Sequence, residues 1–344
     1  MSASALFHTA PGQVAWQDVT LAPLGAGEVR VETVYSAISP GTESLIFQGR
    51  IPKDMTLDAT LGSLSGRFEY PFSYGYALVG RIVELGGGVS LDRLGQRVFL
   101  FHPHQDQVVV TLEHCLTIPE DIPFRAALFA PNMESALSFV MDAAPLIGEQ
   151  VIVFGQGVVG LLTTAVLSRF PLGRLTGADM LAPRRLRSLD WGAKAVIDPA
   201  DAGAWEALHR ELFNGEGPGG ADLCFELSGS LTALNQAIGI TGFAGRILLG
   251  SWYGTADRPV DLGGPFHRRR ISLISSQVST LNPGLTGRWD KARRMTLVWD
   301  WLRRLKPETL ITHEFRPNDC QKAFEVCSQR EDSVLQTVFR YSTD

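Results

Sequence analysis

The sequence predicts an α/β protein with a β-rich domain and a doubly wound domain built on a parallel sheet. Three observations lead to this fold class. The 344 residues exceed the length of one typical domain. Short β-like runs broken by glycine and proline dominate residues 1 to about 124, whereas apolar strands alternate with helices from about residue 125 onward. A glycine-rich turn, Gly155 to Gly160, follows one of those strands and opens a helix.

The first part of the chain is expected to form a small, barrel-like β domain. Its predicted strands are 28–35, 77–85, 97–101 and 107–112. Helical periodicity is scarce there, and the runs are short and bounded by turn residues, as is typical of strands.

The second part is expected to form right-handed βαβ units and a parallel sheet, because its strands alternate with helices. Its predicted strands are 150–154, 174–178, 195–197, 222–227, 246–249 and 270–275, and its predicted helices are 126–143, 158–169, 184–191, 205–213 and 231–240. The tail is predicted as helix 290–305, a short segment 313–316, a helix around 320–329 and a final strand 334–341. We therefore expect a catalytic domain over 1–135, a nucleotide-binding domain over 136–276, and a return to the first domain over 277–344.

Composition favours a soluble protein that acts on small molecules. Hydrophobic residues make up 45% of the chain, the net charge is -5 and the mean hydropathy is +0.06. No basic block indicates a nucleic acid or a membrane surface as partner. The start lacks the features of a signal peptide, and the cysteines form no CxxC pair, so we expect a cytoplasmic protein without disulfides.

The glycine-rich turn predicts a dinucleotide site. Gly155 permits the tight turn, Gly157 lets the backbone approach the pyrophosphate, and Gly160 lets helix and strand pack closely. The helix start offers free N–H groups to the phosphates. The turn residues expected to bind the cofactor are Gly155, Gln156, Gly157, Val158, Val159 and Gly160. The alternative is a doubly wound domain in which the turn binds nothing.

Asp179 ends the second strand of this domain and indicates the preferred cofactor. A carboxylate there accepts hydrogen bonds from the ribose hydroxyls and repels a 2′-phosphate, which favours NAD over NADP. Arg184 and Arg185 follow closely and could soften that preference, so NADP stays open.

Two further strand ends should line the cofactor, because ligands in open α/β sheets bind outside the carboxyl ends of the strands. The residues concerned are Ser228, Gly229, Gly250, Ser251 and Trp252. The alternative is that Trp252 and its neighbour Tyr253 are ordinary packing aromatics.

With this order of parts, the chain resembles the medium-chain dehydrogenase/reductase superfamily over essentially its whole length. Residues 28–43 (EVRVETVYSAISPGTE), 74–86 (YGYALVGRIVELG) and 95–98 (GQRV) resemble three signatures of that superfamily. The resemblance implies a GroES-like catalytic domain, a Rossmann domain and an active site in the cleft between them. It also implies a homodimer or homotetramer.

The positions that hold catalytic zinc in alcohol dehydrogenases of this superfamily read differently here. They are Pro40, Tyr76 and Ala77, and neither cysteine nor histidine occurs near 129–132. The lobe that holds a structural zinc is missing as well. Catalytic zinc needs three protein ligands and an open position, so we expect no metal.

Residues 101–105 (FHPHQ) and 130–137 (APNMESAL) resemble a narrower branch of this superfamily. That branch includes the bacteriochlorophyllide a hydroxyethyl dehydrogenase. The resemblance implies an alcohol/ketone couple at a secondary carbon, and the stretch 267–289 has no counterpart that would identify the substrate.

Without zinc, a hydrogen-bond donor or general acid must act on the substrate oxygen. The candidate catalytic residues are Tyr76, Thr42, His102, His104 and Glu134. Tyr76 replaces a zinc ligand, and Thr42 matches the serine or threonine of the superfamily that relays a proton. A histidine side chain ordinarily titrates near neutral pH and can serve as acid or base without a large pKa shift.

Each candidate also has a structural interpretation. Tyr76 can fill the space of the missing zinc, and Thr42 can cap a turn or a helix start. The histidines can be solvated side chains of a rigid loop, and Glu134 can be a surface or capping acid.

Three hypotheses on function remain. The first is a zinc-independent dehydrogenase that transfers a hydride between NAD(H) and a secondary alcohol or ketone of moderate size. The second is an NADPH-dependent reductase of activated C=C bonds or quinones, against which Asp179 argues. The third is a non-catalytic protein that binds NAD.

Overall fold

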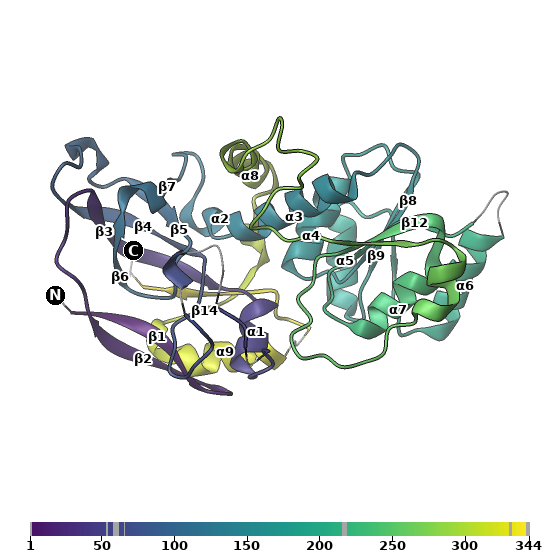
Figure 1. Ribbon diagram of the computed structural model, residues 1–344, viewed down its shortest axis with the longest axis horizontal. Coiled ribbons are helices and arrows are strands. Elements are labelled where there is room, and N and C mark those ends of the chain that lie inside the picture. Colours follow the sequence, from purple (N-terminus) through teal and green to yellow (C-terminus); the bar gives the residue numbers. More distant parts are fainter. Residues whose placement is uncertain are drawn as a thin grey trace. The chain divides into compact units, whose positions relative to one another are not determined.

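The computed structural model describes residues 2–52, 54–57, 62–64, 66–214, 219–329 and 332–341. The chain divides into two compact units (Figure 1). Unit 1 comprises Met1–Pro131 and Trp299–Asp344, and unit 2 comprises Asn132–Val298. Helices α3 (Ala130–Ala143) and α8 (Lys291–Leu305) carry the chain across the boundary.

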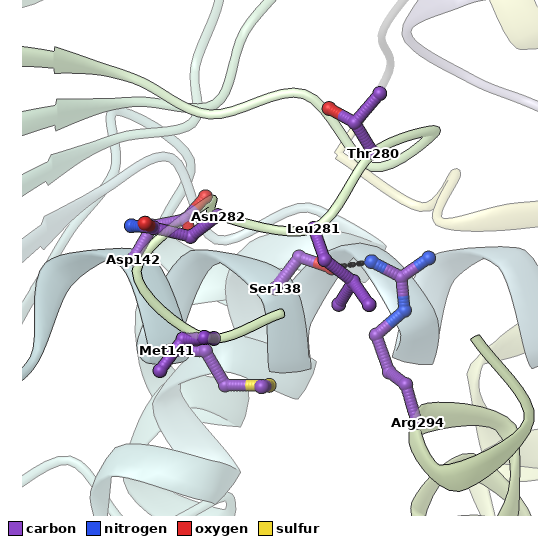
Figure 2. Close-up of a pocket in the computed structure, with 8 residues that line it drawn as sticks. Ser138, Met141, Asp142, Thr280, Leu281, Asn282 and Arg294 are labelled. Carbon is purple, nitrogen blue, oxygen red and sulfur yellow. Dashed lines mark hydrogen bonds between the residues drawn. The ribbon is translucent and has the colours of Figure 1, made fainter. Parts of the chain in front are cut away.

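The segment 277–298 lies in unit 2, although the sequence predicted that it returns to the first domain. Arg294 accounts for this difference. Its guanidinium donates hydrogen bonds to Ser138 Oγ (2.9 Å) and Glu134 Oε1 (2.6 Å), both on α3, and to the Val278 carbonyl (2.8 Å). Figure 2 shows the guanidinium directed at Ser138. A buried arginine therefore fixes the segment to unit 2.

Unit 1 is built on mainly antiparallel β structure, in which only β14 and β15 of the pairs described are parallel. A hairpin is formed by β1 (Ser2–Ala10) and β2 (Gln13–Thr20). A larger sheet has the order β14-β15-β3-β4-β5-β7, with β6 paired to β3. Its strands are β3 (Glu28–Ile38), β4 (Leu78–Leu85), β5 (Arg97–Leu100), β6 (Gln107–Thr111), β7 (Leu116–Thr117), β14 (Ile311–Phe315) and β15 (Gln336–Arg340). Strand β15 lies between β3 and β14, so the end of the chain pairs with strands from its first part.

The helices of unit 1 are short. Those described that lie wholly within it are α1 (Thr42–Phe47), α2 (Phe124–Ala127) and α9 (Cys320–Gln329). The predicted helix 126–143 is in fact two helices, α2 and α3. Pro131 lies in the first turn of α3, where its missing N–H costs nothing but where it cannot continue α2. The hairpin β1–β2 and helix α1 were not predicted, because their patterns are short and their apolar residues irregular.

Unit 2 is the predicted doubly wound domain. All of its strand pairs are parallel, in the order β10-β9-β8-β11-β12-β13. The strands are β8 (Gln150–Phe154), β9 (Arg174–Ala178), β10 (Ala195–Ile197), β11 (Ala221–Glu226), β12 (Thr241–Leu249) and β13 (Ser272–Ser275). The helices between them are α4 (Val158–Leu167), α5 (Ala182–Asp190), α6 (Ala202–Phe213) and α7 (Leu231–Ile240).

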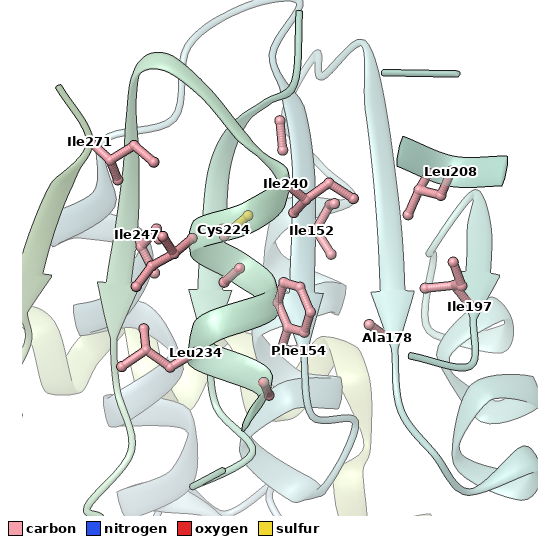
Figure 3. Close-up of a cluster of buried hydrophobic side chains, with 14 residues drawn as sticks. Ile152, Phe154, Ala178, Ile197, Leu208, Cys224, Leu234, Ile240, Ile247 and Ile271 are labelled. Carbon is pink, nitrogen blue, oxygen red and sulfur yellow. The ribbon is translucent and has the colours of Figure 1, made fainter. Parts of the chain in front are cut away.

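The core of unit 2 explains how the sheet presents its carboxyl ends. Ile152 and Phe154 of β8 pack with Ile247 of β12 in one buried cluster (Figure 3). Leu234 and Ile240 of α7 belong to the same cluster. Burial of these side chains holds the strands in register, so β8, β11 and β12 end side by side. Within the residues described, no helix combines the length and apolar character needed to cross a bilayer.

Candidate active site

The glycine-rich turn of unit 2 has the close contacts that its glycines predict. Gly155 has φ +87°, and a Cβ there would lie 2.7 Å from the backbone of Ser228. A Cβ on Gly160 would lie 1.8 Å from the Gly155 carbonyl oxygen. Gly157 is different, because a Cβ there would meet only Arg184 Nη1, at 3.9 Å. The turn is therefore closed on the protein side and open above Gly157, where a pyrophosphate would approach the backbone.

Two side chains of the turn point into the protein. Gln156 is fully buried, and its amide donates to the Val153 carbonyl at 2.9 Å and accepts from Thr164 Oγ1 at 3.1 Å. Val158 is buried at the start of α4, whereas Val159 is half-buried. A nucleotide at this turn would therefore meet the backbone of Gln156 rather than its side chain.

Asp179 lies just beyond β9 and holds the turn from the other side. Its Oδ2 accepts from Gln156 N at 2.7 Å, and its Oδ1 accepts from Leu181 N at 2.9 Å. The carboxylate is half-buried, and each oxygen keeps a lone pair for a further donor such as a ribose hydroxyl.

The two arginines after Asp179 have different surroundings. Arg185 Nη1 donates to the Asp179 and Met180 carbonyls, at 2.7 and 2.8 Å, and forms a 3.0 Å ion pair with Asp198. The Arg184 guanidinium instead reaches the glycine-rich turn at Gly157. Of the two arginines, Arg184 is thus the one that lies against the Gly157 position.

Sequence reasoning missed Glu226, the last residue of β11. This carboxylate is fully buried, and its Oε1 accepts from Ser228 N at 2.9 Å and from the Ser228 hydroxyl. Its Oε2 accepts from Tyr253 Oη at 2.5 Å. Burial, followed by the nearby Glu226 charge, raises the pKa of Tyr253. The available signal was an acid at the end of an apolar strand, directly before a predicted cofactor turn.

The same residue joins the two predicted cofactor turns. The Glu226 carbonyl accepts from Gly250 N at 3.1 Å and from Ser251 Oγ at 3.2 Å. Ser251 Oγ in turn accepts from Gly229 N at 2.9 Å. Trp252 is half-buried beside these turns. The predicted residues at the ends of β11 and β12 thus form one hydrogen-bonded group, and Tyr253 is part of it.

Unit 1 brings Tyr76 to the segment that precedes α1. Tyr76 Oη donates a 2.5 Å hydrogen bond to Ser39 Oγ, and both side chains are half-buried. Thr42 is the first residue of α1, one position beyond its N-cap Gly41, and is half-buried. The candidate residues Tyr76 and Thr42 are therefore both next to the loop before α1, Tyr76 through its bond to Ser39 and Thr42 through its place in the chain.

His104 and Glu43 form a pair inside unit 1. His104 Nε2 lies 2.9 Å from Glu43 Oε2, and both side chains are fully buried. The solvated loop that sequence reasoning kept as an alternative is therefore wrong for His104. The imidazole makes T-shaped contacts with the Phe324 and Phe339 rings, so this side chain belongs to the interior.

His102 and His8 flank that pair. Burial lowers the pKa of His102, a hydrogen bond from its ring to the Pro103 carbonyl raises it, and nearby His104 lowers it further. Burial and His104 together lower the pKa of His8 to about 3. The His8 ring stacks on Phe72, with ring centroids 5.2 Å apart.

Glu134 lies in unit 2, where it pairs with buried Arg294 at 2.6 Å. Burial raises the pKa of Glu134, and the Arg294 charge opposes that rise. The idea of a surface acid is therefore wrong. A shallow pocket beside this pair is lined by Ser138, Met141, Asp142, Thr280, Leu281, Asn282, Leu285 and Arg294 (Figure 2).

The donor set at the superfamily's zinc positions does not fit zinc. Pro40 and Ala77 have no ligand atom, and the Tyr76 hydroxyl is bonded to Ser39. In the part of the chain that the structure describes, no three His, Cys, Asp or Glu side chains gather in a way that would hold a metal ion.

No protein-family model matches the chain. Among curated proteins, it is 25% identical over 316 residues to D-guloside 3-dehydrogenase of Escherichia coli K12, covering 86% of this chain and 87% of that one. It is 25% identical over 206 residues to (R,R)-butanediol dehydrogenase of Bacillus subtilis, covering 52% of this chain and 58% of that one.

Solved structures share the fold over nearly the whole chain. The alcohol dehydrogenase RspB of E. coli CFT073, solved with NADH, superposes with a TM-score of 0.78 at 20% identity, covering 99% of each chain. A zinc-dependent alcohol dehydrogenase 2 from Streptococcus pneumonia superposes with a TM-score of 0.79 at 19% identity, again covering 99% of each chain. The chain therefore has the fold of alcohol dehydrogenase-like enzymes, in line with its resemblance to the medium-chain dehydrogenase/reductase superfamily, and it is an NAD(P)-dependent oxidoreductase.

Proposed function

We propose that this protein is a zinc-independent dehydrogenase that transfers a hydride between NAD(H) and a secondary alcohol or ketone of moderate size. Tyr76 donates a hydrogen bond to the reacting oxygen, in place of a metal. The observation that carries the proposal is the Tyr76–Ser39 hydrogen bond of 2.5 Å at a position that would otherwise hold a zinc ligand.

The Tyr76 and Ser39 hydroxyls suit that role because either one can donate the hydrogen bond to the other. Without substrate, Tyr76 donates to Ser39 Oγ. When Tyr76 turns its proton to a substrate oxygen, Ser39 can rotate its own hydroxyl and donate to Tyr76 Oη. Bound NADH would supply the hydride from its nicotinamide C4. The hydrogen bond from Tyr76 then stabilises the negative charge that develops on the substrate oxygen, and a proton taken up from water completes the alcohol.

The preference for NAD rests on Asp179 and Arg185. Asp179 is held towards the turn by two backbone N–H groups, so its charge faces the ribose site. Arg185 is occupied by Asp198 and two carbonyls, which removes it as a partner for a 2′-phosphate. Arg184 near Gly157 is suited to the pyrophosphate or the adenosine ribose.

The substrate class rests on the relatives. One is by name a D-guloside dehydrogenase and another a butanediol dehydrogenase, so polyols and sugar derivatives head the panel to be tested. Thr42 and His102 stay predicted participants in catalysis. The cytoplasmic location and the homo-oligomeric assembly also stay predictions. The place of the protein in the branch that includes bacteriochlorophyllide a hydroxyethyl dehydrogenase also stays a prediction.

The test is Tyr76→Phe, which removes one hydroxyl and keeps the ring. We expect kcat for ketone reduction with NADH to fall about 100-fold, because one donor to a developing oxyanion contributes on this scale. The dissociation constant for NADH, measured by nucleotide fluorescence, should stay unchanged. Trp16→Phe in β2 serves as the matched aromatic control. Full turnover by Tyr76→Phe would refute the proposed role.

The cofactor is tested separately. NADH should bind more tightly than NADPH, and turnover should persist after exhaustive chelation. A clear NADPH preference with reduction of quinones or activated C=C bonds would favour the reductase alternative instead. Binding of NADH without turnover over a broad panel would favour a non-catalytic protein.

A further inference from the structure

We propose that Glu43 and His104 form a buried positioning pair that fixes the Tyr76 hydroxyl from both sides. The pair does not touch substrate. It holds the two backbone segments from which Tyr76 and Ser39 meet. This inference rests on the proposed role of Tyr76, and the experiment below separates failure of one from failure of the other.

The Glu43 carboxylate holds the Ser39 side. Its Oε1 accepts from Ser39 N at 2.8 Å, while its Oε2 contacts His104 Nε2 at 2.9 Å. Glu43 is fully buried, so each contact replaces water that the carboxylate has lost. Ser39 is the residue whose hydroxyl accepts from Tyr76, and its backbone is therefore tied directly to the pair.

The His104 imidazole holds the Tyr76 side. Gly75 directly precedes Tyr76 and has φ +129°, a conformation that L side chains rarely adopt. A Cβ at Gly75 would lie 2.9 Å from His104 Cδ2 and 3.0 Å from Nε2, so the ring packs directly on this peptide. The residue before Tyr76 is thus a glycine because the imidazole occupies the space of a side chain.

The outer face of the imidazole is also held. His104 Nδ1 lies 2.7 Å from Ser36 Oγ, and Ser36 Oγ lies 2.9 Å from Tyr341 Oη. Ser36 is on β3 and Tyr341 follows β15, so strands distant in sequence fix the ring orientation. With both ring nitrogens hydrogen-bonded, the imidazole cannot rotate without losing a contact in the interior.

The pair can therefore act through position rather than through charge. Glu43→Gln keeps the length of the side chain. Its amide oxygen can accept from Ser39 N, and its amide nitrogen can donate to His104 Nε2 once the imidazole adopts the other tautomer. Glu43→Asp keeps the charge but shortens the side chain, so it cannot reach both partners. A positioning role predicts that the aspartate variant is the more damaged one.

The experiment is a double-mutant cycle between Glu43→Asp and Tyr76→Phe, with Glu43→Gln beside it. We expect Glu43→Asp to lower kcat about tenfold, since a misplacement near 1 Å can cost more than this. Glu43→Gln should lower it less than threefold, and the NADH dissociation constant should not change. In the Tyr76→Phe background the loss from Glu43→Asp should vanish, because its effect acts through the missing hydroxyl.

Ser44→Ala is the matched control, because Ser44 is the next residue of α1 and its buried hydroxyl instead faces Cys327 Sγ at 3.8 Å. It should leave kcat unchanged. A full tenfold loss from Glu43→Asp in both backgrounds, or none in either, would overturn the positioning role. A larger loss in Glu43→Gln than in Glu43→Asp would show that charge matters instead. If Tyr76→Phe alone keeps full activity, the proposed function fails instead.

Discussion

Each unit buries a carboxylate beside its candidate residues, and the two carboxylates have different partners. Glu43 in unit 1 faces an imidazole, whereas Glu226 in unit 2 faces hydroxyls and a backbone N–H. The second set of partners cannot change charge near neutral pH, since burial and Glu226 raise the pKa of Tyr253 above its usual value.

The two units should therefore differ in how they respond to pH and to the loss of a single contact. In unit 2 the buried carboxylate of Glu226 faces hydroxyls and a backbone N–H, and Glu134 faces the guanidinium of Arg294. The interior of unit 1 collects three histidines, of which His8 and His104 are fully buried. We therefore expect unit 1 to respond to pH and unit 2 to respond mainly to loss of a fixed contact.

The largest effect is expected at Arg294, in unit 2. Arg294→Met leaves Glu134 buried without its cation and should lower the free energy of unfolding by about 3–5 kcal/mol. Denaturant unfolding at neutral pH measures this loss. Arg294→Lys, which keeps the charge but not the planar fork, should lose less. If Arg294→Met were as stable as the unchanged protein, the Glu134–Arg294 pair would not be a contact on which the stability of unit 2 depends.

Acid stability provides the next effect, in unit 1. Folding lowers the pKa of His8 from 6.5 to about 3, so the unfolded chain binds a proton here that the folded chain does not. Its contribution to the free energy of unfolding is therefore full above pH 6.5. It is lost as the pH falls towards 3, at about 1.4 kcal/mol per pH unit.

His8→Phe tests this contribution, because a phenyl ring can keep the stacking on Phe72 without titrating. The difference in unfolding free energy between the two proteins should grow as the pH is lowered from 6.5. Hydrogen exchange, followed by mass spectrometry, should place the acid-induced opening in unit 1. A difference that is constant over this range would contradict the lowered pKa.

Cofactor binding should respond to Glu226→Gln. The amide cannot accept from both Ser228 and Tyr253 as the carboxylate does, so the turns at the ends of β11 and β12 lose a common anchor. We expect NADH to bind about tenfold more weakly, which corresponds to about 1.4 kcal/mol. The same loss of NADH affinity at pH 6 and pH 8 would support partners of Glu226 that do not change charge. A loss that varies with pH would contradict the proposed difference between unit 1 and unit 2.

The smallest effect is expected at Asp179. Asp179→Asn keeps the size of the side chain and removes the charge that would repel a 2′-phosphate. The ratio of the NADPH to the NADH dissociation constant should fall about fivefold, which corresponds to about 1 kcal/mol. Asp198→Asn, which instead frees Arg185, is the matched control for the nearby cation. An unchanged ratio in Asp179→Asn would mean that this carboxylate does not select the cofactor.

The parts of the site that could be predicted from sequence are those built from neighbouring residues. The Gly155–Gly160 turn, the strand before it and Asp179 after the next strand all lie within one βαβ unit, so local pattern was sufficient. Strands β8, β9 and β10 have the predicted bounds for the same reason.

Contacts between distant residues could not be predicted in this way. Glu43 and His104 are 61 positions apart, and Ser36 and Tyr341 are 305 apart. Their sequence neighbourhoods contain nothing that pairs one with the other. His104 was chosen as a candidate for its residue type, but its burial and its partner follow from how β3, β15 and the 101–105 loop pack.

The sequence by itself determined the type of fold and where the nucleotide turn lies, because apolar periodicity and glycine placement act over a few residues. Only the tertiary structure decided which acids are buried and what each one faces. Burial removes the water that would otherwise solvate a charge, so a buried carboxylate requires partners that only the folded chain can bring to it. Glu43 is paired with an imidazole and Glu134 with an arginine, whereas Glu226 accepts hydrogen bonds from two hydroxyls.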